Sequence, residues 1–279
     1  MRVRIIFAVL NRGEYVPFHH QHILSQIIED ILQKGAIRYP HYNFSSLKGL
    51  TKVSRKGLRY YSSKVTLVFS TDSEEFAQLF LSKLFERKQI KVGALLLRPE
   101  SVEAEERPAF ANQMKYICIS PLVISDKSFG GVNTKKFIPP DSDVFSDLLY
   151  ETTMQRMEKS GQFSQEQINS FYQFQFLPDK EYLDRIKDGE KKFARIYSLQ
   201  NRLFKIEVRG YTLPFVLYAD PVVQEFVFNT GLGTFTERGF GMIDQTQNER
   251  QRGTNPYTLD TSLFPQPQPT PNNEEPTDS

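Results

Sequence analysis

The sequence has one cysteine among its 279 residues, Cys118 in the apolar segment YICIS, and no apolar run long enough to cross a membrane. A single cysteine excludes an intramolecular disulfide framework and disfavours a thiolate metal cage. A membrane helix needs about 20 consecutive apolar residues. The N-terminal MRVRIIFAVLNRGEY has too short an apolar run, and no small-residue cleavage site, for a secretory signal. With 39% hydrophobic and 24% charged residues, the composition is that of a soluble globular protein, and we expect a cytoplasmic one.

The motifs of nucleotide and metal cofactors are also missing. The glycine-rich segment TGLGTFTERGFGMID, residues 230–244, follows a helical pattern and precedes a strand pattern, which is the reverse of a dinucleotide fingerprint. The segment has no Lys-Ser/Thr pair of a P-loop, and no carboxylate cluster in the chain suggests a two-metal nuclease. His19 and His22 stand at i, i+3, but apart from His20 between them no further His or Cys lies nearby to complete a metal site. We therefore expect neither a cofactor nor a metal.

Basic residues are concentrated in the N-terminal quarter. Residues 1–70 contain eleven Lys and Arg against three Asp and Glu, a balance of 11 − 3 = +8, although the whole chain carries only +2. Such a region favours an anionic partner, while a solvated lysine-rich surface is equally consistent with charge alone. From residue 246 onward two Arg stand against five Asp and Glu, or 2 − 5 = −3, and the segment ends in the Pro-rich QPQPTPNNEEPTDS. Because it has little to bury, we predict a disordered tail over 246–279.

The first 110 residues predict a β-α-β-β-α-β unit. RVRIIFAVL is typical of a buried strand, and in HHQHILSQIIEDILQKG the apolar residues recur at helical spacing. YNFSSLKGL and LRYYSSKVTLVFS are predicted as strands joined at Lys56-Gly57. A second helix, EEFAQLFLSKLFER, can be capped by Thr71-Asp72-Ser73, and the strand IKVGALLLR follows it. This order is that of the ferredoxin-like (RRM-like) fold, which we predict for residues 1–110.

Residues 111–245 repeat the order more loosely. The strand QMKYICISPLVIS precedes the helix SDVFSDLLYETTMQRMEKSG, and FYQFQFL, KKFARIYSL and LFKIEVRGYTLPFVLYA alternate as strands do. DPVVQEFVFNTG predicts a short helix and GFGMID a closing strand. The predicted fold class is therefore α+β, with two tandem ferredoxin-like domains. The glycine-rich loop of the second domain is either an ordinary tight turn or a backbone nest that cradles phosphate.

All four histidines lie within one 23-residue segment, residues 19–41, inside the basic region. Metal-free cleavage of RNA needs the neighbouring 2′-hydroxyl as nucleophile, an acid and a base, and cations for the developing charge. Histidine suits the proton transfers because its unperturbed pKa is about 6.5. His20 is predicted on the buried side of the first helix and His22 on its solvent side, whereas His41 follows the helix on a loop, where catalytic groups are more common. His41 is therefore the best acid–base candidate, with His20 and His22 in reserve.

The segment DPVVQEFVFNTGLGTFTERGFGMID resembles the C-terminal signature of the CRISPR-associated endoribonucleases that process precursor CRISPR RNA, in the repeat-associated mysterious protein (RAMP) superfamily. That signature is a short helix, Gly-x-Gly, a polar stretch and Gly-Phe-Gly, here Gly231-Leu232-Gly233 and Gly239-Phe240-Gly241. VPFHHQHILSQII is similar to the family's Pro-x-x-His-Gln opening of the first helix, and KKFARIYSL and FKIEVRG stand where members carry two strands. The resemblance covers residues 1–245.

The resemblance implies a metal-independent endoribonuclease that cuts CRISPR repeat RNA and leaves a 2′,3′-cyclic phosphate, or its opened form, and a 5′-hydroxyl. The family's histidine also follows the first helix, ahead of a strand that NFSSL fits. Some relatives place a tyrosine on that helix; this chain lacks it, and Tyr39 or Tyr42 could take its place. The implied catalytic residues are His41, Tyr39 and Lys48, and the implied RNA-binding residues are Lys52, Arg55, Lys56, Gly231, Gly233, Arg238, Gly239 and Gly241.

The expected partner is CRISPR repeat RNA, and other CRISPR effector subunits and a second copy in a homodimer are further candidates. A non-catalytic RNA-binding subunit of a CRISPR effector is the first alternative, since several superfamily members bind RNA without cutting it. A small-molecule enzyme on a ferredoxin-like scaffold is the second. The clustered histidines favour the nuclease over the first alternative, and the lack of a cofactor motif counts against the second.

Overall fold

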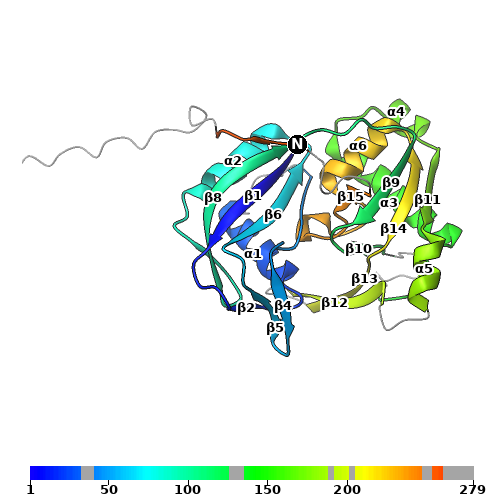
Figure 1. Ribbon diagram of the computed structural model, residues 1–279. Helices are drawn as coiled ribbons and strands as arrows, with labels where there is room; N and C mark the ends of the chain where they lie inside the picture. Colours follow the sequence, from blue (N-terminus) through cyan, green and yellow to red (C-terminus); the bar gives the residue numbers. More distant parts are fainter. Residues whose placement is uncertain (33–40, 126–134, 188–191, 201–204, 247–252, 260–279) are drawn as a thin grey trace, which may run out of the picture.

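The computed structural model describes residues 1–32, 41–125, 135–187, 192–200, 205–246 and 253–259. Figure 1 shows two lobes side by side, the first built from the N-terminal part of the chain and the second from the part that follows. Among the described residues, no helix is both long enough and apolar enough to pass through a membrane.

The first lobe has a central antiparallel sheet in the order β8-β1-β6-β3, with two helices in the connections. This is the strand order that the β-α-β-β-α-β unit predicts. Its elements are β1 (Arg2–Val9), α1 (Gln21–Leu32), β3 (Tyr42–Phe44), β6 (Lys64–Thr71), α2 (Glu74–Phe85) and β8 (Leu95–Glu105).

Three predicted strands of this lobe are broken. The predicted strand at 58–70 divides into β5 (Gly57–Tyr60) and β6, and β5 belongs to a separate three-stranded sheet with β2 (Tyr15–Val16) and β4 (Thr51–Ser54). Of the predicted strand at 42–50, only the first part forms β3, and the rest leads to β4. That at 90–98 is a hairpin of β7 (Ile90–Val92) and β8, because Gly93 has a left-handed φ of +61°. The β4–β5 hairpin projects from the lobe in Figure 1.

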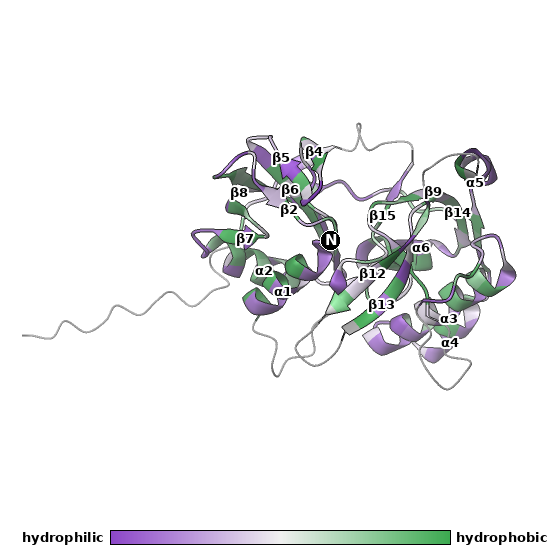
Figure 2. Cartoon of the chain, turned by 90° about the horizontal axis from the view of Figure 1, so that it is seen from below, coloured by the Kyte–Doolittle hydropathy of each residue, from purple (hydrophilic) through white to green (hydrophobic). Residues whose placement is uncertain are grey.

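The second lobe repeats the strand order of the first, as β15-β9-β14-β11. The prediction of an α+β fold with tandem ferredoxin-like domains is therefore confirmed. In Figure 2 helices α1 and α2 of one lobe and α3 and α4 of the other lie toward the same side of the molecule. The main elements of the second lobe are β9 (Gln113–Cys118), α3 (Asp143–Ser160), β11 (Phe174–Pro178), β14 (Pro214–Ala219), α6 (Pro221–Thr230) and β15 (Ile243–Gln245).

An additional three-stranded sheet, in the order β10-β13-β12, accompanies this lobe. It explains why two predicted strands are each divided: QMKYICISPLVIS supplies β9 and β10, and LFKIEVRGYTLPFVLYA supplies β13 and β14, in different sheets. The further elements are β10 (Leu122–Val123), α4 (Gln165–Ser170), α5 (Lys180–Lys187), β12 (Ala194–Gln200), β13 (Lys205–Tyr211) and the 3-10 helix η1 (Thr236–Arg238).

Local sequence explains the limits of the long helices. Ser142 caps the start of α3 by accepting from the Phe145 amide, and Gly161 ends the helix in a left-handed conformation. Helix α6 begins with Asp220, whose carboxylate accepts from the Val222 amide, and with Pro221 in its first turn. These residues set both limits of α3 and the start of α6, and both helices contribute to the lobe boundary described below.

A C-terminal strand, β16 (Thr254–Pro256), adds to the edge of the first lobe's sheet by pairing with β8. The Tyr257 amide donates to the Val102 carbonyl at 2.9 Å, and Tyr257 and Leu259 pack against the first lobe's core. This strand was not predicted, since the disordered tail was expected to start at residue 246. Residues 260–279 lie outside the described part of the chain.

A buried cationic side chain joins the two lobes. Arg2 of β1 lies 2.8 Å from the Glu105 carboxylate and 3.4 Å from that of Asp244, and it donates to the Ile243 carbonyl at 2.7 Å. Its guanidinium also lies 4.5 Å from the centroid of the Phe228 ring. The first strand of the chain and its last ferredoxin strand are thereby held together across 241 residues.

Candidate active site

His41 lies directly before β3, at the boundary of the two lobes. Its Nε2 is 3.0 Å from the Arg156 carbonyl oxygen of α3, and its ring stands edge-on to Phe226 of α6 at 5.8 Å. Because a carbonyl oxygen only accepts, Nε2 must carry the proton, which leaves the lone pair on Nδ1. Among the described residues, none bonds to Nδ1. Burial and the nearby Arg156 charge lower the pKa of His41, so the ring is neutral at neutral pH.

The backbone of His41 is fixed as well. Its carbonyl oxygen accepts from the Thr71 hydroxyl at 2.9 Å and from the Asp72 amide at 3.4 Å. The Asp72 carboxylate in turn accepts from the Gln162 amide at 3.1 Å, and burial raises its pKa. A half-buried carboxylate therefore stands close to the imidazole and favours its protonated form, opposing Arg156.

Arg156 supplies a cation beside His41. It donates from Nη1 to the Gly231 carbonyl at 2.6 Å and from Nη2 to the Thr230 carbonyl and hydroxyl, both at 2.8 Å. Its guanidinium also lies 5.4 Å from the Phe226 centroid. Burial lowers the pKa of Arg156 to about 10, so it remains charged at neutral pH. A neutral imidazole with one unprotonated nitrogen and a permanent cation thus share this boundary.

The outcomes for Tyr39 and Lys48, the other two predicted catalytic residues, differ. Tyr39 lies outside the described residues, and its alternative Tyr42 is buried in the first lobe's core, stacked on Phe69 at 5.7 Å. Lys48 bridges to Thr66 of β6, whereas His41 contacts Thr71 of the same strand. Five residues of strand separate those contacts by roughly 16 Å, at about 3.3 Å per residue. This distance exceeds the reach of a lysine side chain, so the structure does not group Lys48 with His41.

The two reserve histidines lie at the start of α1. His20 is buried, and both of its ring nitrogens face the protein: Nδ1 is 3.0 Å from the Pro17 carbonyl, and Nε2 accepts from the Leu47 amide at 3.4 Å. Burial also lowers the pKa of His20. His22 is half-buried and donates from Nδ1 to the His19 carbonyl at 2.5 Å. His20 thus has the contacts of a structural residue, in line with its predicted position on the buried side of the helix.

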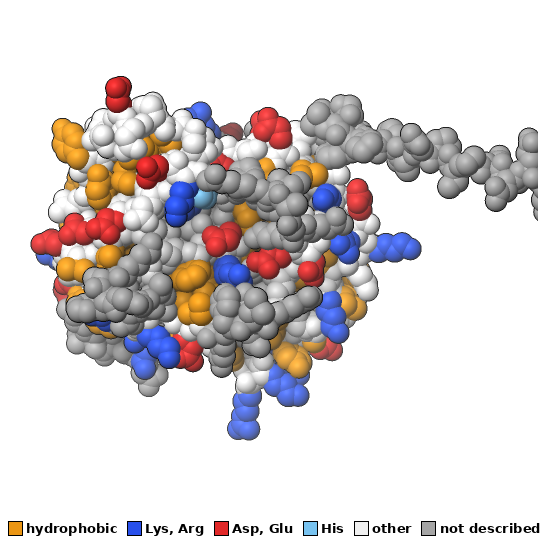
Figure 3. All heavy atoms as spheres, turned by 180° about the vertical axis from the view of Figure 1, so that it is seen from behind, with side chains coloured by type: hydrophobic (Ala, Val, Ile, Leu, Met, Phe, Trp, Pro, Cys, Tyr) orange, Lys and Arg blue, Asp and Glu red, His pale blue; other side chains and the backbone are white. Residues whose placement is uncertain are grey.

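The basic residues predicted to bind RNA form an exposed hairpin. Lys52 lies on β4, and Arg55 and Lys56 form the turn before β5. The Lys52 ammonium lies 5.4 Å from the Tyr61 ring centroid. Arg238 of η1 instead pairs with Glu29 of α1 at 3.8 Å. On the face in Figure 3, charges of both signs are interspersed, while Lys and Arg side chains protrude at the lower edge, where Figure 1 places this hairpin.

The four glycines of the loop are buried, and protein atoms explain why they are glycines. Gly231, Gly233, Gly239 and Gly241 all have left-handed φ values, between +70° and +87°. A β-carbon at each would come within 3.0 Å of another residue, such as the Asn43 side chain for Gly231 or the Phe44 ring for Gly239. The loop thus packs against β3 of the first lobe. Direct RNA contact by these glycines, like that of Lys52, Arg55, Lys56 and Arg238, stays a prediction.

Comparison with known proteins identifies the family. Residues 103–245, from the end of β8 to the end of β15, match the family model described as CRISPR associated protein Cas6, C-terminal. This chain belongs to the Cas6 family. The match includes α3, α6 and the glycine-rich loop, so Arg156 and the loop at the lobe boundary both lie in the part that matches the Cas6 C-terminal model.

Two curated Cas6 proteins are similar over most of this chain. A putative CRISPR-associated endoribonuclease-like protein Cas6 from Pyrococcus furiosus is 22% identical, covering 87% of this chain and 98% of the relative. A CRISPR-associated endoribonuclease Cas6 1 from Methanocaldococcus jannaschii is also 22% identical, covering 85% and 90%.

Solved structures show the same fold. The product of a Cas6-related gene from Pyrococcus furiosus has a TM-score of 0.71 at 17% identity, over 89% of this chain and 99% of that one. A RAMP protein that binds different RNA substrates has a TM-score of 0.69 at 18% identity, over 88% and 99%. At these identities the likeness shows the Cas6 fold alone.

The sequence pattern did not identify Asp72 and Arg156 as neighbours of His41. Asp72 was considered only as part of a helix cap. Arg156 lies between Met154 and Met157, both buried in α3, and this flanking is the signal that would have placed it on the inner side of the helix. The pairing of β3 with β6 brings Asp72 to His41, and the packing of the two lobes brings Arg156 there. Periodicity encodes neither.

Proposed function

We propose that this protein is a metal-independent endoribonuclease that cleaves CRISPR repeat RNA in precursor transcripts to give guide RNAs. Membership of the Cas6 family supports this, as do relatives named CRISPR-associated endoribonuclease. The observation that carries the chemistry is the state of His41, a neutral imidazole whose Nε2 is held by a carbonyl while Nδ1 keeps its lone pair.

In the proposed mechanism, Nδ1 of His41 removes the proton of the 2′-hydroxyl at the cut site. The 2′-oxygen attacks the adjacent phosphorus, and the bond from phosphorus to the 5′-oxygen breaks. The imidazolium formed in the first step returns a proton to the leaving 5′-oxygen, which gives a 2′,3′-cyclic phosphate and a 5′-hydroxyl. The positive charge of Arg156 stabilises the negative charge that develops on the phosphorane.

RNA affinity is proposed to come from other residues. Lys52, Arg55 and Lys56 on the exposed hairpin carry positive charge into solvent, where it can meet backbone phosphates. These contacts lie away from His41, since the hairpin follows Lys48 at the far end of β3. Binding and chemistry are therefore expected to respond to different substitutions.

The second candidate function is RNA binding without cleavage. It is favoured by the separation of Lys48 from His41, which leaves the site without the predicted lysine, and by the similar RAMP protein that binds different RNA substrates. Other effector subunits would then be the partners of this chain. Because both functions require RNA binding, only a cleavage assay separates them.

The test measures cleavage of repeat RNA from the CRISPR array of the source genome. We expect cutting in excess EDTA, and we expect a substrate to remain uncut when the nucleotide 5′ of the cut carries a 2′-deoxy sugar. His41→Ala should lower the single-turnover rate by about 10²-fold or more, the usual scale for a general acid or base, with RNA affinity changed less than about twofold.

His22→Ala is the matched control and should cut at the wild-type rate. If His22→Ala or His20→Ala abolishes cutting while His41→Ala does not, the acid–base role moves to α1. Chelator-sensitive cutting, or cutting of the deoxy substrate at the same position, contradicts the 2′-hydroxyl mechanism. Binding of repeat RNA with no cutting by wild-type protein selects the second candidate function.

A further inference from the structure

A pocket of about 390 Å³ opens in the second lobe between α5 and the strands β12 and β13. Tyr182 and Ile186 of α5 form one side, and Lys192, Phe193, Arg195 and Tyr197 form the other, in and before β12. Thr212, which follows β13, closes the back. No residue of the proposed catalytic site lines this pocket, so it is a separate feature.

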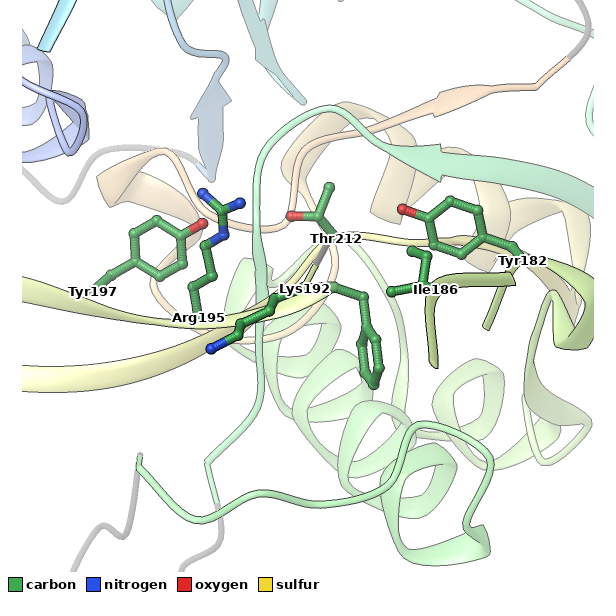
Figure 4. Close-up of a pocket in the computed structure, with 7 residues that line it drawn as sticks. Tyr182, Ile186, Lys192, Arg195, Tyr197 and Thr212 are labelled. Atoms are coloured by element: carbon green, nitrogen blue, oxygen red, sulfur yellow. The ribbon is translucent and has the colours of Figure 1, made fainter. Parts of the chain in front are cut away.

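The lining combines cationic, hydroxyl-bearing and apolar side chains. Lys192 and Arg195 are exposed cations, and none of the described residues that line the pocket is acidic. Figure 4 shows the Tyr182 hydroxyl directed toward Thr212, while the Thr212 hydroxyl is directed away from Tyr182, toward the side on which the Arg195 guanidinium and Tyr197 lie. Ile186 and Phe193 give the pocket an apolar wall. Positive charge, hydroxyl groups and aromatic rings in one cavity fit a ligand that has both an anionic group and a flat ring.

The first lobe reaches the rim of the pocket. The His19 ring packs edge-on to Tyr197 at 5.0 Å, and Tyr197 in turn packs edge-on to Phe240 of the glycine-rich loop at 5.7 Å. Arg195 is also close enough to lower the pKa of His19 electrostatically, alongside burial. Tyr197 therefore lies between the pocket and the first lobe, which places the pocket beside the lobe boundary.

We propose that this pocket takes one nucleotide of the bound RNA, with its base against the aromatic side chains and its phosphate on Arg195 and Lys192. The pocket is near the lower end of the 300–1,000 Å³ that small-molecule sites occupy, which suits a single nucleotide and excludes a duplex. Aromatic rings stack with any base, and guanidinium binds phosphate through paired donors. The Thr212 and Tyr182 hydroxyls supply base-edge hydrogen bonds and hence selectivity. This inference depends on the proposed function only in taking RNA as the ligand.

The experiment measures binding of the full chain to fluorescein-labelled 12-nucleotide homopolymers of rA, rC and rU across a salt series. Arg195→Gln is the test variant and Arg185→Gln, on the exposed side of α5, is the matched charge control. Arg195→Gln should weaken binding at least fivefold and reduce the slope of log K against log salt by about 0.7, the value for one phosphate contact with a single strand. Arg185→Gln should stay within twofold of wild type.

Two further measurements address the base. Thr212→Val should change the ratio of affinities among the three homopolymers, whereas Ser198→Ala, an exposed hydroxyl of β12, should leave that ratio unchanged. An oligomer that carries 5-iodouridine should crosslink to Tyr182, Phe193 or Tyr197 on irradiation. Crosslinks confined to other residues, together with equal binding by Arg195→Gln and Arg185→Gln, would overturn the proposal.

The four ribonucleoside 5′-monophosphates are the remaining probe, because a free nucleotide has the same chemistry as one residue of RNA. Competition of a monophosphate with RNA for wild-type protein supports the pocket as a nucleotide subsite of the RNA. Binding of a monophosphate that neither competes with RNA nor depends on Arg195 overturns it. Cleavage of repeat RNA by Arg195→Gln at saturating RNA tests the His41 site separately, so failure of one proposal is distinguishable from failure of the other.

Discussion

At the scale of single residues, His41 and His20 differ in what their ring nitrogens contact. Both rings are removed from solvent far enough to lower their pKa values. His20 has a backbone partner at each nitrogen, whereas His41 has a described partner at Nε2 alone. The sequence could order the two by helix face and loop position, but the tautomer of His41 follows from a carbonyl 115 residues away. That detail becomes visible only in the folded molecule.

The pH dependence of cleavage reports on this imidazole. Burial and Arg156 favour the neutral form of His41, so the base becomes active as pH rises through a pKa below about 6.5. We expect kcat/KM to rise with pH below that value and to be level from there to neutral pH. A rate profile on repeat RNA between pH 4.5 and 8 checks this. An inflection above pH 7 would mean that another group is the base.

The glycines of the loop permit a second prediction at this scale. Gly239 and Gly161 have nearly the same left-handed φ, +80° and +72°, but a β-carbon at Gly239 would lie 2.5 Å from the Phe44 ring, while one at Gly161 meets nothing within 4 Å. Gly161→Ala should cost only the backbone term of about 1–2 kcal/mol. Gly239→Ala should cost at least about 1 kcal/mol more, the scale of overpacking a core. Equal melting temperatures for the two variants would show that the crowding at Phe44 is relieved without cost.

At the scale of elements, the long helices were easier to predict than the strands, whereas the short helices α4 and α5 were not predicted. Helices α2, α3 and α6 carry capping residues and apolar spacing in their own sequence, so their limits were found within a few residues. In the sequence, segments such as 58–70 and 203–219 look like single strands, because apolar and polar residues keep alternating across the point where one strand ends and the next begins. Which sheet each half joins is decided by partners far along the chain. The hairpin at Gly93 and the strand β16 were missed for the same reason.

The junction of α3 and α6 gives a prediction at this scale. Arg156 of α3 donates three hydrogen bonds to Thr230 and Gly231 at the end of α6, where the helix dipole is negative. Arg156→Gln should lower stability by about 2 kcal/mol, the scale of hydrogen bonds from a charged donor. Burial and the Arg156 charge both lower the pKa of His41, so the variant should also raise that pKa by removing the charge while the burial remains.

Thermal melting and the pH profile of cleavage measure the two effects. Arg87→Gln is the control, since Arg87 is exposed in the first lobe after α2. It should change neither quantity. A profile midpoint that stays in place in Arg156→Gln would show that Arg156 does not influence His41, even if the variant melts earlier.

At the scale of the whole molecule, two lobes with one strand order arise from segments without a visible sequence repeat. The order of helices and strands was sufficient to predict this, because connection rules leave few ways to arrange a β-α-β-β-α-β unit. The contacts between lobes were beyond reach of the sequence. Arg2 looked like one of eleven basic residues at the N-terminus, yet it is buried between Glu105 and Asp244 and is unavailable to an anionic partner. Part of the basic excess is therefore structural.

The C-terminal segment ties the end of the chain back to its beginning, and truncation tests this. Strand β16 pairs with β8 at the edge of the first sheet, where Pro256 is tolerated because an edge strand need not donate on its outer side. Removing residues 260–279, which are polar and acidic, should leave the melting temperature and the cleavage rate within error of the full chain.

Removing residues 253–279 also deletes β16. The hydrogen bond from the Tyr257 amide to the Val102 carbonyl and the packing of Tyr257 and Leu259 are then lost as well. Since each backbone hydrogen bond contributes about 1 kcal/mol and burial adds to it, this second truncation should lose at least about 2 kcal/mol. Arg2 and Arg4 both pair with Glu105 on the strand that β16 covers, so the first lobe should open earlier in hydrogen exchange around β8. Equal stability of the two truncated proteins would show that β16 adds nothing to the fold, and loss of cleavage in the shorter deletion would place the tail in the RNA site.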